Sequence, residues 1–374
     1  MPHLFDRMAL GPVLVPNRIA VSPMCQYSAS DGTMGDWHLQ HLMGLAMSGA
    51  GLIVGEATAV ERIGRITHGC TGLYSDANEA AMARVLDAAR RVALPGTKFA
   101  IQLAHAGRKA STEVPWLGGK PLAVDEDPWP TVAPSALPFS DGWHVPAALD
   151  ASGVARIRDA FRRAAERAVR IGFDAIELHA AHGYLVHEFL SPLTNERSDE
   201  YGGSLQNRMR LAVEIARDVR GVLPATTALG ARITGCDWVD DGFNPEDAVV
   251  LARALKGEGV DYVCVSSGGN IASAGIPVGP GYQVAFAEKV KAETRITTRA
   301  VGMIYDARQA DDIVASGRAD CVALARAFLN DPRWGLHAAE RLGVAIDYPP
   351  QYKFGSRQFW PGAELALKAV GGSS

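Results

Sequence analysis

The sequence predicts a single α/β barrel built from eight parallel strands that alternate with helices. Short runs of apolar and β-branched residues alternate along the chain with longer amphipathic stretches, a pattern typical of repeated strand–helix units. Several short runs have a continuously apolar centre, such as Leu52-Ile53-Val54, as expected of parallel strands covered on both faces. The length of 374 residues is compatible with a one-domain barrel that carries insertions.

The eight expected strands are residues 18–24, 51–57, 98–105, 174–179, 230–234, 261–267, 295–302 and 321–326. The clearest helical patterns cover residues 78–94, 154–171, 205–223, 245–257, 283–292 and 306–316. Asn244-Pro245-Glu246 has the composition of a helix N-terminus, and Gly172 and Gly317 stand where C-terminal caps belong. A doubly wound open sheet is the alternative, but no G-x-G-x-x-G motif follows the first strand.

Three segments lie outside the strand–helix repeat of the single domain, residues 1–374. Residues 4–18 contain Gly-Pro and Pro-Asn steps and predict a small hairpin before the first strand. Residues 112–146 lack periodicity and are rich in proline, which indicates either a lid over the site or a packed structural insertion. Residues 353–374 form a C-terminal tail, of which 371–374 are expected to be disordered.

Composition excludes several classes of partner. A formal charge of −4 argues against nucleic acid or an anionic membrane. No apolar run reaches the ~18 residues of a membrane span, and the N-terminal segment shows no signal-peptide pattern, so a cytoplasmic protein is expected. The five cysteines form no C-x-x-C pair, which favours a reducing compartment and argues against zinc or an iron–sulfur cluster. Cys25, at a strand end, is either an inert buried thiol or a reactive thiolate.

Polar residues gather where the predicted strands end. In a barrel, the carboxyl ends of all strands meet at one rim, which carries the active site. The polar or glycine-rich segments at these ends are residues 23–27, 56–57, 102–109, 179–184, 266–269, 302–303 and 325–326. Their convergence predicts a binding site at this rim.

The most specific local signal is His179-x-x-His182-x-Tyr184. The two imidazoles could bind a metal in a barrel hydrolase or lyase, but no third ligand is adjacent except Glu177 and Glu188. They could instead donate two hydrogen bonds to an oxygen that gains negative charge, with Tyr184 as the proton donor. A pair of buried structural histidines is the third interpretation.

Arg232 lies in the middle of an apolar strand, where its charge needs a partner. That partner is either a buried carboxylate or an anionic ligand. The last two strands of a barrel commonly end in a phosphate site. Gly302, Ala325 and Arg326 stand at these ends, because glycine allows close backbone approach and arginine grips phosphate at two points.

These motifs together resemble Old Yellow Enzyme flavoproteins, in the thermophilic-like branch that includes xenobiotic reductases. The resemblance runs from about residue 5 to about residue 352 and is carried by long motifs. They are SPMCQY (residues 22–27), IQLAHAGRK (101–109), HAAHGYL (179–185), HEFLSPLTN (187–195) and DEYGGS (199–204).

The resemblance implies FMN, held without a covalent bond, as the cofactor. Pro23, Met24, Cys25 and Ala57 would line the isoalloxazine, with Cys25 tuning the potential of the flavin. Gln102 would pair with its pyrimidine ring and Arg232 would face the N1/O2 edge. Gly302, Met303, Ala325 and Arg326 would hold the phosphate. No metal is expected.

The implied activity is that of an ene-reductase. NADPH or NADH would reduce the flavin, and an α,β-unsaturated carbonyl compound would then be reduced in a ping-pong hydride transfer. His179 and His182 would bind the carbonyl oxygen, Tyr184 would supply the proton and Tyr27 would help to close the pocket. The partners expected are small enone-type molecules and further copies of the chain in a dimer or tetramer. Phe354, Arg357 and Trp360 in the tail are all candidates for reaching a neighbouring site.

Overall fold

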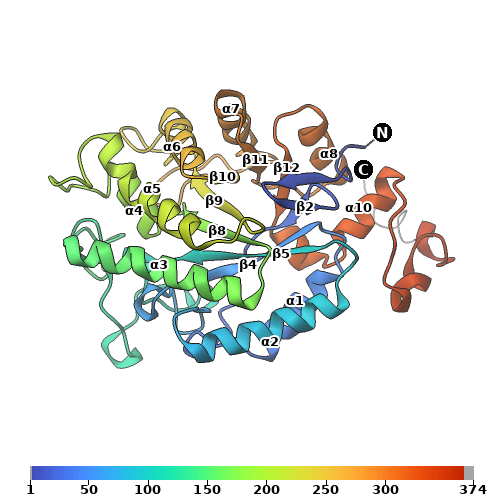
Figure 1. Ribbon diagram of the computed structural model, residues 1–374, viewed down its shortest axis with the longest axis horizontal. Helices are drawn as coiled ribbons and strands as arrows, with labels where there is room; N and C mark the ends of the chain where they lie inside the picture. The colour runs from blue at the N-terminus through green and yellow to red at the C-terminus, as the bar shows by residue number, and fades with distance from the viewer. Residues whose placement is uncertain (1, 366–374) are drawn as a thin grey trace.

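The computed structural model describes residues 2–365, and its centre is a closed barrel of parallel strands. Around the barrel the strand order is β10-β11-β12-β3-β4-β5-β8-β9, which is chain order, and helices surround it (Figure 1). The predicted fold is therefore confirmed. The strands are β3 (Ile19–Val21), β4 (Leu52–Ala59), β5 (Lys98–Ala104), β8 (Ala175–Ala180), β9 (Ala228–Thr234), β10 (Tyr262–Ser266), β11 (Thr297–Ala300) and β12 (Cys321–Leu324).

The predicted helices are present with small shifts at their ends. They are α2 (Asp76–Val92), α3 (Ala151–Ile171), α5 (Leu205–Val222), α6 (Pro245–Gly257), α7 (Val284–Thr294) and α8 (Ala307–Ala315). The side chain of Asn244 caps α6 by accepting from two backbone N–H groups, and Gly172 ends α3 with a φ of 95°. No helix among residues 2–365 is long and apolar enough to cross a membrane.

Four further helices were not among the clearest sequence patterns: α1 (Asp36–Ala46), α4 (Leu185–Leu190), α9 (Arg326–Asn330) and α10 (Trp334–Leu342). Every residue of α4 is buried, so no polar face marks its period. In α1 only His38, Leu45 and Ala46 are buried, so its apolar stripe is weak. A sequence shows helical periodicity only where one face of the helix is buried and the other is exposed to solvent.

The predicted hairpin is confirmed as β1 (Met8–Leu10) paired antiparallel with β2 (Val13–Val15). Both strands alternate buried and exposed residues, as a two-faced hairpin requires. The inward residues pack with barrel residues such as Leu52, Val54 and Ala100. The hairpin lies at the right of Figure 1, at the end of the barrel where the strands begin.

All eight strands differ from their predicted bounds by one to three residues at one or both ends, and two of these differences have a local cause. The strand expected over 295–302 is shorter, because Arg295 has a φ of 52° and ends α7. Strand β4 continues beyond Ala57 through a β-bulge, where its register with β5 shifts between Gly55 and Ala57. Bulges redirect side chains and are frequent beside active sites.

Residues 112–146 carry little regular structure, as predicted. They contain two short 3-10 turns, Pro115–Leu117 and Val124–Glu126, and strand β6 (Val132–Ala133), which pairs with β7 (Ala147–Ala148). Trp129 anchors the segment by donating to the carbonyl of Ile63 (3.0 Å). The lid role stays a prediction. The tail is described as far as Leu365, so residues 371–374 lie outside the described part.

Candidate active site

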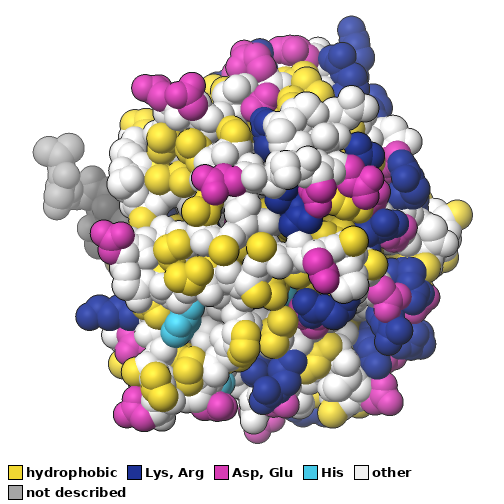
Figure 2. All heavy atoms as spheres, turned by 90° about the vertical axis from the view of Figure 1, so that its left-hand side faces the viewer, with side chains coloured by type: hydrophobic (Ala, Val, Ile, Leu, Met, Phe, Trp, Pro, Cys, Tyr) yellow, Lys and Arg dark blue, Asp and Glu magenta, His cyan; other side chains and the backbone are white. Residues whose placement is uncertain are grey.

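The carboxyl ends of the strands converge on the face shown in Figure 2, where hydrophobic side chains mingle with Lys and Arg. The predicted rim residues from β3, β4, β5, β8, β9 and β10 reach this end of the barrel because all eight strands are parallel. The topology therefore brings these segments to one end of the barrel, as the sequence predicted. What each side chain does there depends on its contacts.

His179 and His182 lie in series rather than side by side. His179 Nδ1 accepts from the backbone N–H of Ala181 (3.3 Å), which leaves the proton of His179 on Nε2. That Nε2 lies 3.3 Å from His182 Nδ1, and His182 Nε2 lies 2.6 Å from the hydroxyl of Ser266. The hydrogen bonds therefore run in one direction, from Ala181 to Ser266, through two neutral imidazoles. The sequence motif predicted that both imidazoles donate to one oxygen. In the structure His182 contacts the hydroxyl oxygen of Ser266, while His179 contacts His182.

Arg232 lies beside these imidazoles. It pairs in register with His179 across β8 and β9, and its Nη2 donates to Ser266 Oγ (3.3 Å). Burial, and next the charge of Arg232, lower the pKa of both His179 and His182 well below the usual value. Both therefore act as neutral N–H donors at neutral pH.

Tyr184 stands beside the pair at the N-cap of α4. Its ring meets that of His179 edge-on, with centroids 4.9 Å apart. Burial, and then the neighbouring Cys25 and Tyr27, raise the pKa of the Tyr184 phenol well above its ordinary value. The hydroxyl is consequently protonated and can donate a proton.

Lys109 ties the site loops together. Its Nζ donates to the carbonyls of His182 (2.9 Å) and Gly269 (2.8 Å), and it lies 5.3 Å from the ring centroid of Tyr184. Burial lowers the pKa of Lys109 to about 8, against the opposing charge of Glu188. This lysine links the loops that follow β5, β8 and β10.

Gln102 is oriented by a buried ion pair inside the barrel. Its Nε2 donates to Glu177 Oε1 (2.8 Å), and Glu177 in turn pairs with Arg299 and accepts from the hydroxyl of Tyr262 (3.2 Å). Glu177 and Arg299 are both 0% exposed, so each needs the other to offset the cost of burying its charge. The network fixes the amide of Gln102 at the mouth.

The bulge in β4 gives Glu56 a supporting role. As the extra residue it turns toward α1, where its Oε1 lies 3.3 Å from His38 Nε2. Its Oε2 accepts from the backbone N–H of Gln26 (3.1 Å). The carboxyl group thereby holds the loop of residues 23–27, while Ala57, after the bulge, faces Gln102 in register.

This loop carries the predicted Pro23, Met24, Cys25 and Tyr27, all of them partly exposed. Burial by surrounding protein atoms raises the pKa of the Cys25 thiol well above its ordinary value, so Cys25 is a thiol and not a nucleophilic thiolate. Tyr27 has a φ of 50° and meets Trp116 of the 112–146 segment edge-on, at 5.7 Å between centroids.

The predicted phosphate ligands lie at the ends of two paired strands. Gly302 and Met303 follow β11, and Ala325 and Arg326 follow β12. Gly302 has a φ of 107°, and a Cβ there would lie 2.8 Å from that of Gln283, so only glycine fits. The geometry is compatible with the predicted set, whose ligand role stays a prediction.

The described residues offer no set of metal ligands around the two histidines. Within residues 2–365, no three His, Cys, Asp or Glu side chains gather closely enough to hold a metal ion. Glu177 pairs with Arg299, and Glu188 accepts from the backbone N–H of Arg108 (2.9 Å), so neither carboxylate joins the imidazoles.

Sequence reasoning did not assign roles to Lys109, Ser266, His38 or Asp237. Lys109 and Ser266 stand in rim segments, so their position at strand ends was a usable signal. His38 lies on a helix without a clear period, and Asp237 follows β9 by a few residues. Their contacts depend on tertiary packing, which no local pattern encodes.

Fold and site together define an α/β-barrel enzyme whose mouth holds neutral imidazoles, a protonated tyrosine and a strand-borne arginine. A family model described as the NADH:flavin oxidoreductase / NADH oxidase family matches residues 3–343. The chain belongs to this family and is a flavin-dependent NAD(P)H oxidoreductase, which confirms the resemblance to the Old Yellow Enzymes.

Relatives of the chain are named NADPH dehydrogenase. The one from Geobacillus sp. (strain WCH70) is 42% identical over 356 residues, covering 95% of this chain and 98% of the relative. The one from Bacillus subtilis (strain 168) is 40% identical over 354 residues, covering 94% and 98%.

Among solved structures, morphinone reductase matches with a TM-score of 0.75 and 30% identity, over 94% of this chain and 92% of that one. A complex of morphinone reductase with tetrahydroNAD matches with a TM-score of 0.74 and 29% identity, over 94% of each chain.

Proposed function

We propose that the chain is an FMN-dependent ene-reductase that uses NADPH or NADH to reduce the activated C=C bond of α,β-unsaturated carbonyl compounds. Family membership gives the flavin and the nicotinamide. The substrate class is inferred from the mouth, where N–H donors and a proton donor stand together.

The residues at the mouth fit FMN. Arg232 Nε is buried and, among the described residues, has no hydrogen-bond partner, which suits an anionic group at this point. Gln102 would meet the pyrimidine ring, and the 23–27 loop with Ala57 would lie along the isoalloxazine. The phosphate would lie at Gly302, Met303, Ala325 and Arg326. When bound and reduced by the nicotinamide, FMN would supply the hydride that the alkene accepts.

The chain's own residues would polarise and protonate the substrate. His182 would turn from Ser266 toward the substrate carbonyl, which would release the Nε2–H of His179 to the same oxygen. Two neutral donors stabilise the negative charge that develops on this oxygen. Tyr184 would give its proton to the α-carbon, and Tyr27 would close the pocket.

The observation that carries the proposal is the pair of imidazoles held neutral beside Arg232, with Tyr184 against them. Its test is anaerobic mixing of the purified protein. NADPH should bleach the absorbance of bound FMN, and cyclohexenone should restore it. A protein reduced by NADPH that no enone, nitroester or quinone reoxidises would contradict the proposal.

Cytoplasmic location and a homo-oligomer of two or four chains stay predictions. Arg357 pairs with Glu364 within the tail, and Phe354 is 79% exposed. Gel filtration with light scattering will measure the number of chains.

A further inference from the structure

The turn that carries the site residues has an unfavourable backbone. His182 and Gly183 have φ values of 62° and 71°, and His182 has a Cβ that disfavours this region. Gly183 also packs so closely on the loop after β10 that a Cβ would lie 2.3 Å from the carbonyl oxygen of Gly269. Such a conformation persists only where surrounding contacts hold it.

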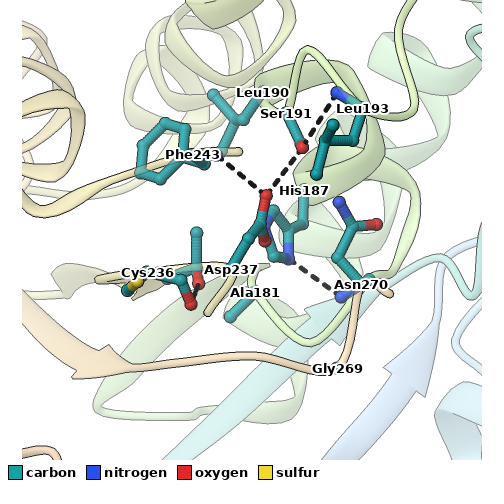
Figure 3. A network of polar contacts seen from close by, with 12 residues as sticks. Ala181, His187, Leu190, Ser191, Leu193, Cys236, Asp237, Phe243, Gly269 and Asn270 are labelled. Atoms are coloured by element: carbon teal, nitrogen blue, oxygen red, sulfur yellow. Dashed lines mark hydrogen bonds and ion pairs between the residues drawn. The ribbon is translucent and has the colours of Figure 1, made fainter. Parts of the chain in front are cut away.

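His187, one turn into α4, provides one of these contacts. Its Nδ1 accepts from the backbone N–H of Gly183 (2.9 Å), so this nitrogen carries no proton. The proton of the neutral ring is then on Nε2, which lies 2.9 Å from Asp237 Oδ1. In Figure 3 the imidazole of His187 lies beside the carboxyl group of Asp237, and both side chains are 0% exposed.

The other oxygen of Asp237 has two donors of its own. Its Oδ2 accepts from the hydroxyl of Ser191 (2.7 Å) and the backbone N–H of Phe243 (2.9 Å). Burial raises the pKa of its carboxyl, but His187, Ser191 and Phe243 outweigh that effect and hold it below the ordinary value. An ionised carboxylate can only accept, so it requires a proton on the facing nitrogen of His187.

We propose that Asp237 and His187 are positioning residues for the reaction. Asp237 fixes the tautomer of His187, and His187 fixes the amide of Gly183, between the substrate-facing His182 and Tyr184. Neither touches substrate or flavin. The inference rests on the proposed ene-reductase function and assigns these two residues to its substrate half. It follows the general rule that a partner behind a functional histidine or turn sets its orientation.

Two substitutions at one position separate the contacts. In His187→Asn the amide oxygen takes the place of Nδ1 and can still accept from Gly183, while the link to Asp237 is lost. In His187→Gln the amide nitrogen reaches toward Asp237, while the acceptor for Gly183 is lost. Reoxidation of the reduced enzyme by cyclohexenone should slow about tenfold in His187→Gln and less than about threefold in His187→Asn. Reduction by NADPH should change less than about twofold in both.

Asp237→Asn is the matching change in the carboxylate. Its NH₂ group must oppose either Nε2–H of His187 or the N–H of Phe243, so reoxidation should again slow about tenfold. Asp331→Asn is the control, since it removes the same kind of pair from His337 (2.7 Å) on the outer helix α10. It should leave both half-reactions unchanged.

The tautomer itself is read by ¹⁵N NMR of histidine-labelled holoenzyme, independently of activity. Wild-type His187 should show an unprotonated Nδ1 and a protonated Nε2. Equal slowing by His187→Asn and His187→Gln, no slowing by either, or a protonated Nδ1 would each overturn the proposal. An enzyme that reduces no enone would contradict the proposed function. The NMR measurement of the His187 tautomer would still test the pair of His187 and Asp237.

Discussion

Two buried imidazole–carboxylate pairs stand behind the two halves of the mouth. His38–Glu56 supports the 23–27 loop, and His187–Asp237 supports the turn at His182. In each pair Nδ1 accepts from a backbone N–H, of Gly35 (3.1 Å) or Gly183 (2.9 Å), and Nε2 faces the carboxyl group. The architecture is the same, but burial raises the pKa of Glu56, whereas the pKa of Asp237 is lowered.

The difference lies in the donors around each carboxyl group. Asp237 accepts from Ser191 and Phe243, whereas among residues 2–365 the one hydrogen-bond donor to Glu56 is Gln26, at a longer 3.1 Å. Its imidazole contact is also longer, 3.3 Å against 2.9 Å. A buried carboxylate stays ionised when hydrogen bonds replace the water it has lost. The carboxyl group of Asp237 is therefore ionised beside a neutral imidazole on one side of the mouth, whereas the pKa of Glu56 is shifted toward the neutral form on the other.

The largest expected effect is that of Tyr184→Phe, which should slow one half-reaction and not the other. Tyr184→Phe removes the proton donor, so reoxidation by an enone should slow by about 10²-fold or more, the usual worth of general acid catalysis. Reduction by NADPH should be nearly normal, since the 23–27 side is unchanged. Stopped-flow absorbance of the flavin measures both steps. An unchanged reoxidation rate would remove Tyr184 from this role.

The second effect tests the charge difference itself. Asp237→Asn should lower the free energy of unfolding by about 3 kcal/mol, because it removes a buried ionised acceptor and sets an NH₂ group against a buried N–H donor. Glu56→Gln keeps an acceptor for Gln26 and should cost about 1 kcal/mol or less. Urea unfolding of the two variants measures this. Equal losses would show that the two pairs do not differ as proposed.

The pH dependence of these two losses should have opposite signs. The pKa of Glu56 is raised, so the stability contributed by its neutral form is lost as pH rises through the folded-state value. The penalty of Glu56→Gln should therefore shrink as pH rises above the ordinary pKa value of 4.5. The pKa of Asp237 is lowered, so its contribution is lost only as pH falls through and below its usual range near 3.8. Melting temperatures of the wild type and both variants across pH measure these losses. Losses that change in the same direction with pH would contradict the prediction.

The smallest effect concerns the thiol at the mouth. Cys25→Ala should shift the midpoint potential of the flavin while turnover changes by only a few-fold, because the thiol is protonated and is expected beside the ring. Spectroelectrochemical titration measures the potential. An unaltered value would contradict the tuning role of Cys25.

The fold was predictable because strand and helix periods are local properties of the chain. The rim residues followed from the rule that parallel strands share one carboxyl end, so His179, Arg232 and Tyr184 could be placed together. The direction of the hydrogen bonds could not be foreseen. For the His179–His182 pair it depends on Ser266 from another strand. For His187 it depends on Asp237 behind the turn. Glu56 is explained only by the bulge, since a regular β4 would have pointed this residue elsewhere.

The hairpin of β1 and β2 has a consequence for kinetics. Its side chains pack on barrel residues at the end where the strands begin, so we expect small molecules to approach from the opposite end. The reducing nucleotide and the compound to be reduced then compete for one volume. An excess of either should inhibit the enzyme by occupying the place of the other, and the initial rate should pass through a maximum as either concentration rises.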